Sequence, residues 1–277
     1  MVQIGIMQGR LVPPIADRLQ CFPRGQWRQE FARAVQAGLD SIEWIYDDFG
    51  ADVNPLASDE GVAEILCLAE QHGVCVRSIC ADYFMDHPLV RAELSALEER
   101  LCVLEWLLER GKMLEAQRIV LPFVDASQIT SPEEARSVAA VLGRVLDRAE
   151  SARMEIHLET SLPPEPYADL LALLPHPMLK VNYDSGNSAS LGYAPYEEFS
   201  AYGERVGSVH IKDRLRAGGT VALGKGDTDF AGLFACLRKM NYEGDLILQV
   251  ARGAHGEEVD WSRRNREFVL RQLSATV

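Results

Sequence analysis

The sequence has 277 residues, of which 47% are hydrophobic and 25% charged, close to the composition of a soluble globular protein with a large core. Its net charge of -13 excludes a broad basic face, so we expect it to bind no nucleic acid. The six cysteines form no C-x-x-C pair, and neither a signal-peptide pattern nor a membrane-length apolar run is found, which predicts a cytoplasmic protein with free thiols.

Eight short runs rich in valine, isoleucine and leucine are predicted to be buried parallel strands. In chain order they are residues 2–7, 40–45, 74–79, 117–121, 154–159, 178–183, 206–211 and 244–249. Helical patterns fill the intervals, at residues 27–37, 59–72, 88–110, 132–150, 165–174, 195–204, 230–240 and 258–273. A helix start at Ser131-Pro132 and the glycines Gly38, Gly73 and Gly244 between helix and strand support this division.

The alternation of eight strands with eight helices predicts an α/β protein, a single-domain (β/α)₈ TIM barrel that spans residues 1–277. No linker or change of composition divides the chain. A doubly wound open sheet is the competing fold, but the turn after the first strand reads Gln8-Gly9-Arg10 and lacks the glycine-rich phosphate-binding pattern.

In a barrel of this kind, function gathers at the carboxyl ends of the strands. The last four predicted strands end near Glu159, Asp184, His210 and Gln249, which together offer two carboxylates, an imidazole and an amide. Oxygen and nitrogen ligands without thiolate suit one divalent ion, Mn²⁺ or Mg²⁺ first, then Co²⁺ or Zn²⁺. We therefore predict a metal site at this end of the barrel.

Six stretches resemble the xylose isomerase-like TIM barrels, the family of sugar phosphate isomerases and epimerases. They are IGIMQGRL (4–11), IHLET (156–160), VNYDSGNS (181–188), VGSVHIKDR (206–214), LGKGDTDF (223–230) and GDLILQVAR (244–252). The resemblance implies a metal held by Glu, Asp, His and Glu, at positions that here hold Glu159, Asp184, His210 and Gln249. The family's ketose 3-epimerases also use the first and last glutamates as two bases, so Gln249 departs from the pattern at a catalytic position.

The expected reaction is proton transfer next to a sugar carbonyl, with Glu159 as general base and a metal-stabilised enediolate. Gln249 can offer an amide oxygen but cannot exchange a proton. Three enzymes remain open: a one-base isomerase, an epimerase whose second base is Asp82, Asp213 or Glu43, and a lyase or dehydratase acting on a keto-sugar or cyclitol. A sugar-binding relic without activity is a further alternative, and a DNA-repair endonuclease is disfavoured by the acidic charge and the six histidines.

The expected partner is a small carbohydrate, and the family resemblance also implies a possible homo-oligomer. Whether the sugar is phosphorylated stays open. The basic residues near the mouth could bind an anion, or Lys212 and Arg214 could instead pair with Asp213 and other surface acids; these basic residues are Arg10, Lys212, Arg214, Arg216, Lys225 and Arg252. Glu165 and Arg216 are included among the sugar contacts only because epimerases of the family contact the sugar there. The predicted substrate-binding residues are Gln8, Arg10, Glu43, Asp82, Glu165, Asn187, Lys212, Arg216 and Arg252.

Overall fold

The computed structural model describes residues 2–275 and contains eight parallel strands closed into a barrel. The order around the barrel is β1-β10-β7-β6-β5-β4-β3-β2, so each barrel strand pairs with the strands before and after it, and the last closes on the first. The predicted (β/α)₈ barrel is confirmed. The barrel strands are β1 (Ile4–Met7), β2 (Ser41–Ile45), β3 (Cys75–Cys80), β4 (Arg118–Phe123), β5 (Glu155–Thr160), β6 (Leu179–Asp184), β7 (Val206–Ile211) and β10 (Leu246–Leu248).

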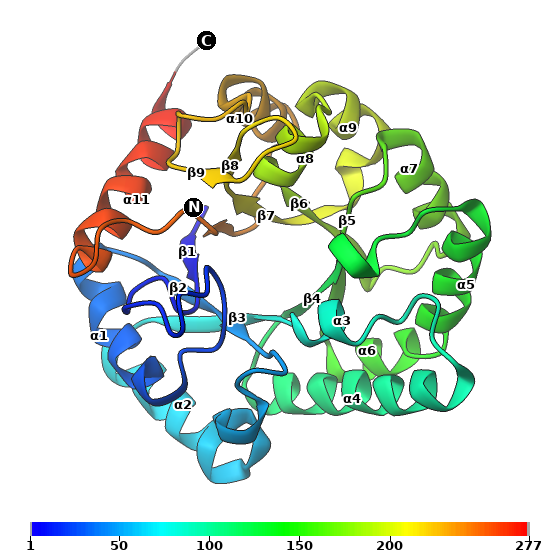
Figure 1. The fold of residues 1–277 in the computed structure, drawn as a ribbon, viewed down its shortest axis with the longest axis horizontal. Coiled ribbons are helices and arrows are strands. Elements are labelled where there is room, and N and C mark those ends of the chain that lie inside the picture. The colour runs from blue at the N-terminus through cyan, green and yellow to red at the C-terminus, as the bar shows by residue number, and fades with distance from the viewer. Residues whose placement is uncertain (1, 276–277) are drawn as a thin grey trace.

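An outer ring of helices covers the barrel on all sides (Figure 1). Its members are α1 (Trp27–Ala37), α2 (Asp59–His72), α4 (Leu94–Met113), α5 (Pro132–Gly143), α6 (Leu146–Ala152), α7 (Pro164–Leu173), α9 (Pro195–Tyr202), α10 (Phe230–Lys239) and α11 (Glu258–Ser274). Because helices cover the outside and side chains fill the inside, β1, β2 and β4 are buried at every residue. Within residues 2–275, no helix has the length and apolar character needed to cross a membrane.

Two helix predictions were wrong in their extent. The helix predicted at residues 88–110 begins only at Leu94, after Arg91 adopts a left-handed backbone with φ of 57°. The helix predicted at 132–150 is two helices, α5 and α6, with the break after Gly143, a weak helix former. Gly38 and Gly73 end α1 and α2 in the left-handed conformation as expected, whereas after α10 Asn241, not Gly244, adopts positive φ.

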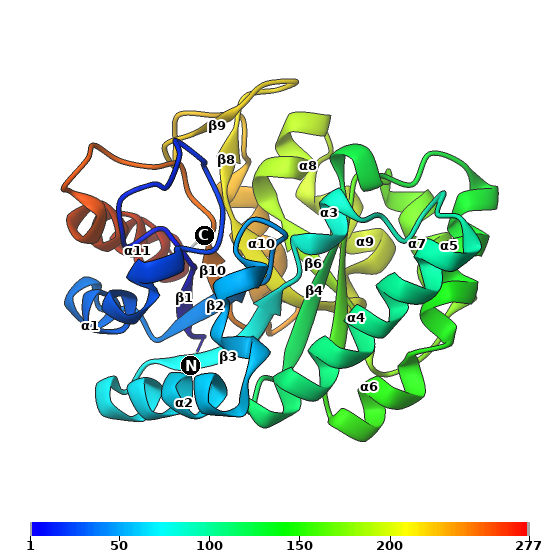
Figure 2. The same cartoon turned by 60° about the horizontal axis from the view of Figure 1, so that its bottom comes forward.

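Three small elements that the sequence did not predict lie at one end of the barrel. They are α3 (Tyr83–Asp86), α8 (Ser185–Leu191) and a hairpin of β8 (Asp213–Arg214) with β9 (Thr220–Val221). Each follows the carboxyl end of a barrel strand, and Figure 2 shows all three at the upper end of the molecule. They build up the rim of the barrel mouth, the end at which the polar residues of the last strands were predicted to meet.

Candidate active site

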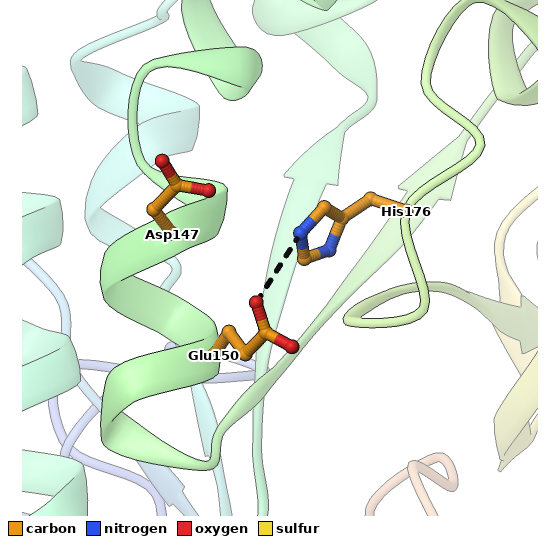
Figure 3. Close-up of side chains that lie close together, drawn as sticks. All are labelled: Asp147, Glu150 and His176. Atoms are coloured by element: carbon orange, nitrogen blue, oxygen red, sulfur yellow. Dashed lines mark ion pairs between the residues drawn. The ribbon is translucent and has the colours of Figure 1, made fainter.

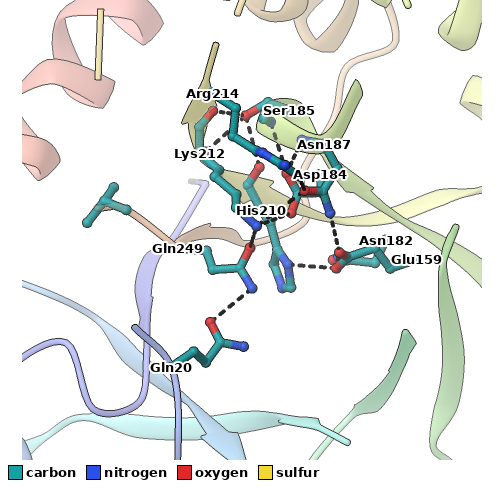
Figure 4. Close-up of polar contacts among 12 residues, drawn as sticks. Gln20, Glu159, Asn182, Asp184, Ser185, Asn187, His210, Lys212, Arg214 and Gln249 are labelled. Atoms are coloured by element: carbon teal, nitrogen blue, oxygen red, sulfur yellow. Dashed lines mark hydrogen bonds and ion pairs between the residues drawn. The ribbon is translucent and has the colours of Figure 1, made fainter. Parts of the chain in front are cut away.

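Three of the four predicted metal ligands meet at the barrel mouth. Glu159, Asp184 and His210 are buried, and each offers a ligand atom that lies within 4.8 Å of the other two. The strand register produces this arrangement, because Asp184 on β6 pairs directly with His210 on β7. Figure 4 shows the three side chains turned toward one another from β5, β6 and β7.

Two asparagine amides fix the carboxylate of Glu159. Asn182 Nδ2 donates to Glu159 Oε2 at 3.0 Å, and Asn187 Nδ2 donates to Oε1 at 2.7 Å. Both donors are buried, so the carboxylate is satisfied without an Arg or Lys partner. Each oxygen keeps a further lone pair for a metal or a substrate proton.

His210 is held between two buried carboxylates. Its Nε2 lies 2.6 Å from Glu43 Oε1, while Glu43 Oε2 accepts from Ser78 Oγ at 2.6 Å. Burial opposes a charged imidazole, but Glu43 and Glu159 outweigh it and raise the pKa of His210 to about 10. His210 Nδ1 lies 3.1 Å from Glu159 Oε2 without meeting hydrogen-bond geometry, and it has no other partner among residues 2–275.

Asp184 both begins a helix and faces the site. Its Oδ1 accepts from the backbone N–H groups of Gly186 and Asn187 and so caps α8, which explains an aspartate at this strand end. The other oxygen, Oδ2, lies 3.2 Å from Lys212 Nζ. A Cβ on Gly186 would lie only 2.6 Å from Lys212 Cγ, so the absence of a side chain there lets the lysine stem pass.

The amide oxygen of Gln249, the fourth predicted ligand, accepts a hydrogen bond from a lysine. Lys212 Nζ donates to Gln249 Oε1 at 3.0 Å as well as to Asp184 Oδ2 and Asn187 Oδ1, so its three N–H groups have three acceptors. The orientation of the Gln249 amide is fixed, since its Nε2 donates to Gln20 Oε1 at 3.1 Å. The ammonium therefore stands between the positions of the second and fourth predicted ligands (Figure 4).

The chemistry of this donor set fits a divalent cation with three protein ligands. A buried histidine that donates one ring N–H to a carboxylate and leaves the other nitrogen without a hydrogen bond is the usual arrangement of a metal-binding histidine. Two carboxylates beside it supply the compensating charge, and an open coordination position leaves room for substrate. Gln249 stays a predicted ligand only if Lys212 moves off its oxygen.

A cavity of about 510 Å³ opens above these residues. Its wall includes Glu159, Asn187, Lys212 and Gln249 from one side of the barrel and Asp82 from the other. The lining is mainly polar, which suits a hydroxylated ligand better than an apolar one.

Six of the nine predicted substrate contacts do not line this cavity, and two of the six are exposed on the surface. Glu165 is exposed in the first turn of α7 and borders a separate surface depression with Glu197. Arg216 is exposed beyond β8 and packs on Gly192. The structure therefore gives no support to a sugar contact by Glu165 or Arg216.

Four more predicted contacts are used in holding the structure together. Arg10 donates to the carbonyls of Leu19 and Val250 and to the Gln20 amide, and Arg252 donates to those of Val12 and Leu19. Gln8 Oε1 accepts from the backbone N–H of Ile45, and Glu43 is fully buried behind His210. The two arginines thus fix the loop after β1 instead of presenting free cations to the cavity.

The proposed second bases differ sharply in position. Asp213 is fully buried and accepts from the backbone N–H groups of Gly224, Lys225, Gly226 and Thr228, so it organises the loop after β9. It does not pair with Lys212 or Arg214, as one of the alternatives had it. Of Asp82, Asp213 and Glu43, Asp82 alone lines the cavity.

Sequence reasoning missed Gln20, which lies in the loop between β1 and α1 and reaches the cavity. No local pattern marks it, because its place depends on the contacts of the loop with Arg10 and Arg252. It also missed a polar barrel interior: Ser208 Oγ links His157 Nδ1 to Asn182 Oδ1, and Arg118 pairs with Asp245 at 2.7 Å. A signal existed for these, since polar residues alternate with apolar ones in β5 to β7.

A second group of possible ligands lies on the outer surface. Asp147 and Glu150 project from α6 toward His176, whose Nε2 is 3.8 Å from Glu150 Oε2 (Figure 3). The backbone N–H of Met178 donates to His176 Nδ1, so a neutral ring carries its proton on the nitrogen that faces the acids. Both acids are exposed, and we treat this group as a solvated surface cluster.

A family model described as xylose isomerase-like TIM barrel matches residues 31–272. The chain belongs to the xylose isomerase-like TIM barrel family. The resemblance seen in the sequence motifs is thereby confirmed, over nearly the whole barrel.

Several solved structures have the same fold at low sequence identity. The IolI protein, solved with a bound zinc atom, has a TM-score of 0.79 at 16% identity, and the match covers 99% of this chain and all of that one. The D-allulose 3-epimerase of a Methylomonas species, solved with D-allulose, gives 0.74 at 18% identity, covering 98% and 97% of the two chains. These likenesses show the fold alone.

Among curated proteins, the chain is similar to the inosose dehydratase of Clostridium botulinum. The two are 23% identical over 190 residues, which is 60% of this chain. The matched segment spans 63% of the length of the dehydratase. A D-allulose 3-epimerase and an inosose dehydratase are thus both found among the similar proteins.

Proposed function

We propose that this protein is a divalent-metal-dependent isomerase or epimerase of a small sugar, with Glu159 as the base that removes a proton beside a carbonyl. The observation that carries the proposal is the convergence of Glu159, Asp184 and His210 within 4.8 Å, with Glu159 lining a polar cavity. Membership of the xylose isomerase-like family supports it. When bound, the cation would polarise a substrate carbonyl and lower the cost of negative charge on its oxygen.

The chain's own residues have distinct tasks in this proposal. Asn182 and Asn187 keep the Glu159 carboxylate in one orientation, so it can take a proton without first rearranging. Glu43 holds the His210 ring through Nε2 and thereby directs Nδ1 at the site. Lys212 and Arg214 are the basic side chains that line the cavity, and Lys212 could donate to a substrate oxygen in place of one of its three present acceptors.

The hydrogen bonds made by the arginine and lysine side chains near the cavity favour an unphosphorylated substrate. The guanidinium groups of Arg10 and Arg252 donate hydrogen bonds to backbone carbonyls of the loop after β1. Arg214 donates to Gly218 O and Asn187 Oδ1, and Lys212 is fully partnered. No arginine pair is left facing the cavity among the described residues, whereas phosphate is usually held by such a pair or by a row of backbone N–H groups.

A dehydratase acting on a keto-sugar or keto-cyclitol is the second candidate. Gln249 favours it, because an amide fixed between Gln20 and Lys212 cannot be the second base of a two-glutamate epimerase. Similarity to an inosose dehydratase adds support. Both candidates begin with the same proton removal by Glu159 and differ in where the next proton goes.

Deuterium incorporation from solvent tests the shared step. The Mn²⁺-loaded protein is incubated in D₂O with D-allulose, L-ribulose and inosose, and deuterium at the carbon beside the carbonyl is followed by NMR. We expect exchange with at least one of them and a loss of about 10²-fold or more in Glu159→Gln, the usual contribution of a general base. Glu165→Gln is the matched control, since Glu165 lies outside the cavity.

Metal analysis completes the test. We expect about one divalent ion per wild-type chain and a strong loss of binding in His210→Ala. Product analysis by NMR then separates an epimer or isomer from a dehydrated product. Absence of exchange with all three compounds in the metal-loaded protein is the result that would remove this proposal.

A further inference from the structure

Two carboxylates, Asp82 and Asp125, line the cavity on the side of β3 and β4, and Asp82 is the less exposed of the two. It follows β3 by two residues, and β3 and β7 are four strands apart in either direction around the eight-stranded barrel. The side chains of Asp82 and Glu159 line the same cavity. A substrate held over His210 and Asp184 on β6 and β7 would therefore have Asp82 on its opposite side.

The local backbone does not explain this aspartate. Asp82 is the N-cap residue of α3, where an aspartate normally accepts from the first free N–H groups of the helix, yet its side chain makes no such bond. Asp184, at the same position before α8, does cap its helix. The carboxylate of Asp82 instead turns to the cavity, where Gln20 Nε2 donates to Oδ2 at 2.8 Å and the Cys80 thiol to Oδ1 at 3.2 Å.

These partners hold Asp82 in place without neutralising it. Gln20 cannot turn its amide over, because its Oε1 accepts from both Arg10 and Gln249. Asp82 forms no salt bridge within the described chain, and Arg10 acts on it only from a longer distance.

The surroundings of Asp82 bring its pKa close to neutral pH, so a minor but substantial fraction of the carboxyl groups carries a proton there. Burial raises the pKa of Asp82 to about 6, against the effect of the hydrogen bonds from Gln20 and Cys80. Asp47 and Glu159 add to the rise. The thiol of Cys80 stays protonated, since burial raises its pKa well above the usual value. Arg10, in the loop after β1, is a cation whose charge favours the ionised form of Asp82.

We infer that Asp82 is the second proton-transfer group of the site, an acid that complements Glu159 from the β3 side of the cavity. This inference rests on the proposed function. The other candidates lack access or chemistry, because Asp213 and Glu43 are fully buried behind the wall and Gln249 carries no exchangeable acid.

The proton balance is simple. Glu159 takes the proton from the carbon beside the carbonyl, the electrons of that C–H bond form a carbon–carbon double bond, and the carbonyl electrons move to oxygen, which gives an enediolate. Asp82 then gives its proton either to the opposite face of that carbon, which inverts it, or to a departing β-hydroxyl, whose C–O bond breaks to release water. Glu159 ends protonated and Asp82 ionised, and exchange with solvent water restores both.

Asp82→Asn separates the two proton steps. With Mn²⁺ and the same three compounds in D₂O, we expect exchange at the carbon beside the carbonyl to persist, while product forms about 10²-fold or more slowly, the usual contribution of a general acid. Asp82→Glu should recover part of the rate. Asp86→Asn, an exposed acid on the same short helix, is the matched control. Product formed by Asp82→Asn at the wild-type rate overturns the inference while leaving the proposed function intact.

A second measurement does not depend on the substrate. Wild-type protein labelled with ¹³C at aspartate carboxyls is titrated by NMR, and the signal missing from Asp82→Asn identifies residue 82. We expect it to titrate about two pH units above an ordinary aspartate, near 6. A titration near the ordinary value of about 4 overturns the inference, whether or not a substrate has been found.

Discussion

Removing the ammonium of Lys212 should strengthen metal binding. Lys212 Nζ lies 3.2 Å from Asp184 Oδ2, one of the predicted ligand atoms. A cation bound to that oxygen at about 2.1 Å would lie no more than about 5.3 Å from the ammonium. In Lys212→Met the stem still fits beside Gly186, but the positive charge is gone.

The size of the effect follows from Coulomb's law. A double and a single positive charge about 5.3 Å apart repel by about 1.6 kcal/mol even at the dielectric constant of water. The side chain of Lys212 is only 14% exposed, so the true dielectric constant is lower and this value is a lower bound. It corresponds to about fifteenfold tighter binding, and Gln249 Oε1, released by the lysine, can add to the gain.

Calorimetric titration with Mn²⁺ or Zn²⁺ at low ionic strength measures this change, because salt screens the repulsion. Lys225→Met is the matched control, since it removes the same charge from an exposed position in the loop after β9. Equal or weaker metal binding by Lys212→Met would show that the cation does not bind beside Asp184.

Two further substitutions test the surroundings of the site. Gln249→Glu should tighten metal binding about tenfold through its added negative charge, which metal titration measures. It should also lower the free energy of unfolding by about 1 kcal/mol, because two oxygens would face each other where Gln249 Nε2 now donates to Gln20. Urea denaturation measures this second effect. Burial raises the pKa of Glu30 to about 8, so the folded protein binds an extra proton above pH 4.5 and loses stability as the pH rises to 8. Glu30→Gln should remove a few kcal/mol of this pH dependence, and equal slopes for mutant and wild type in urea denaturation between pH 5.5 and 8.5 would contradict the assignment.

The sequence correctly predicted the positions of residues that lie at the ends of the barrel strands. Parallel strands in a barrel bring their carboxyl ends to one rim, so a polar residue at the end of each run must lie near its neighbours. Glu159, Asp184 and His210 could be brought together on that ground, and the eight strands themselves follow from short buried apolar runs. The motif Asp184-Ser-Gly-Asn187 likewise carries its own geometry, as a capped helix start.

The loops could not be treated in this way, because their side chains are placed by residues far away in the chain. Arg10 and Arg252 look like anion ligands in the sequence, and only the folded loop after β1 gives their guanidinium groups carbonyl partners. The same loop delivers Gln20 to the cavity and so orients Gln249 and Asp82.

The sequence by itself determined the closed barrel and the end at which its chemistry lies, since a hydrophobic period and the ends of strands are local properties of the chain. Only the tertiary structure decided which polar groups are free to react. Lys212 donates a hydrogen bond to Gln249, and Asp213 accepts hydrogen bonds from backbone N–H groups, whereas Asp82 lines the cavity. Such pairings depend on distances across the barrel, and spacing along one chain does not contain them.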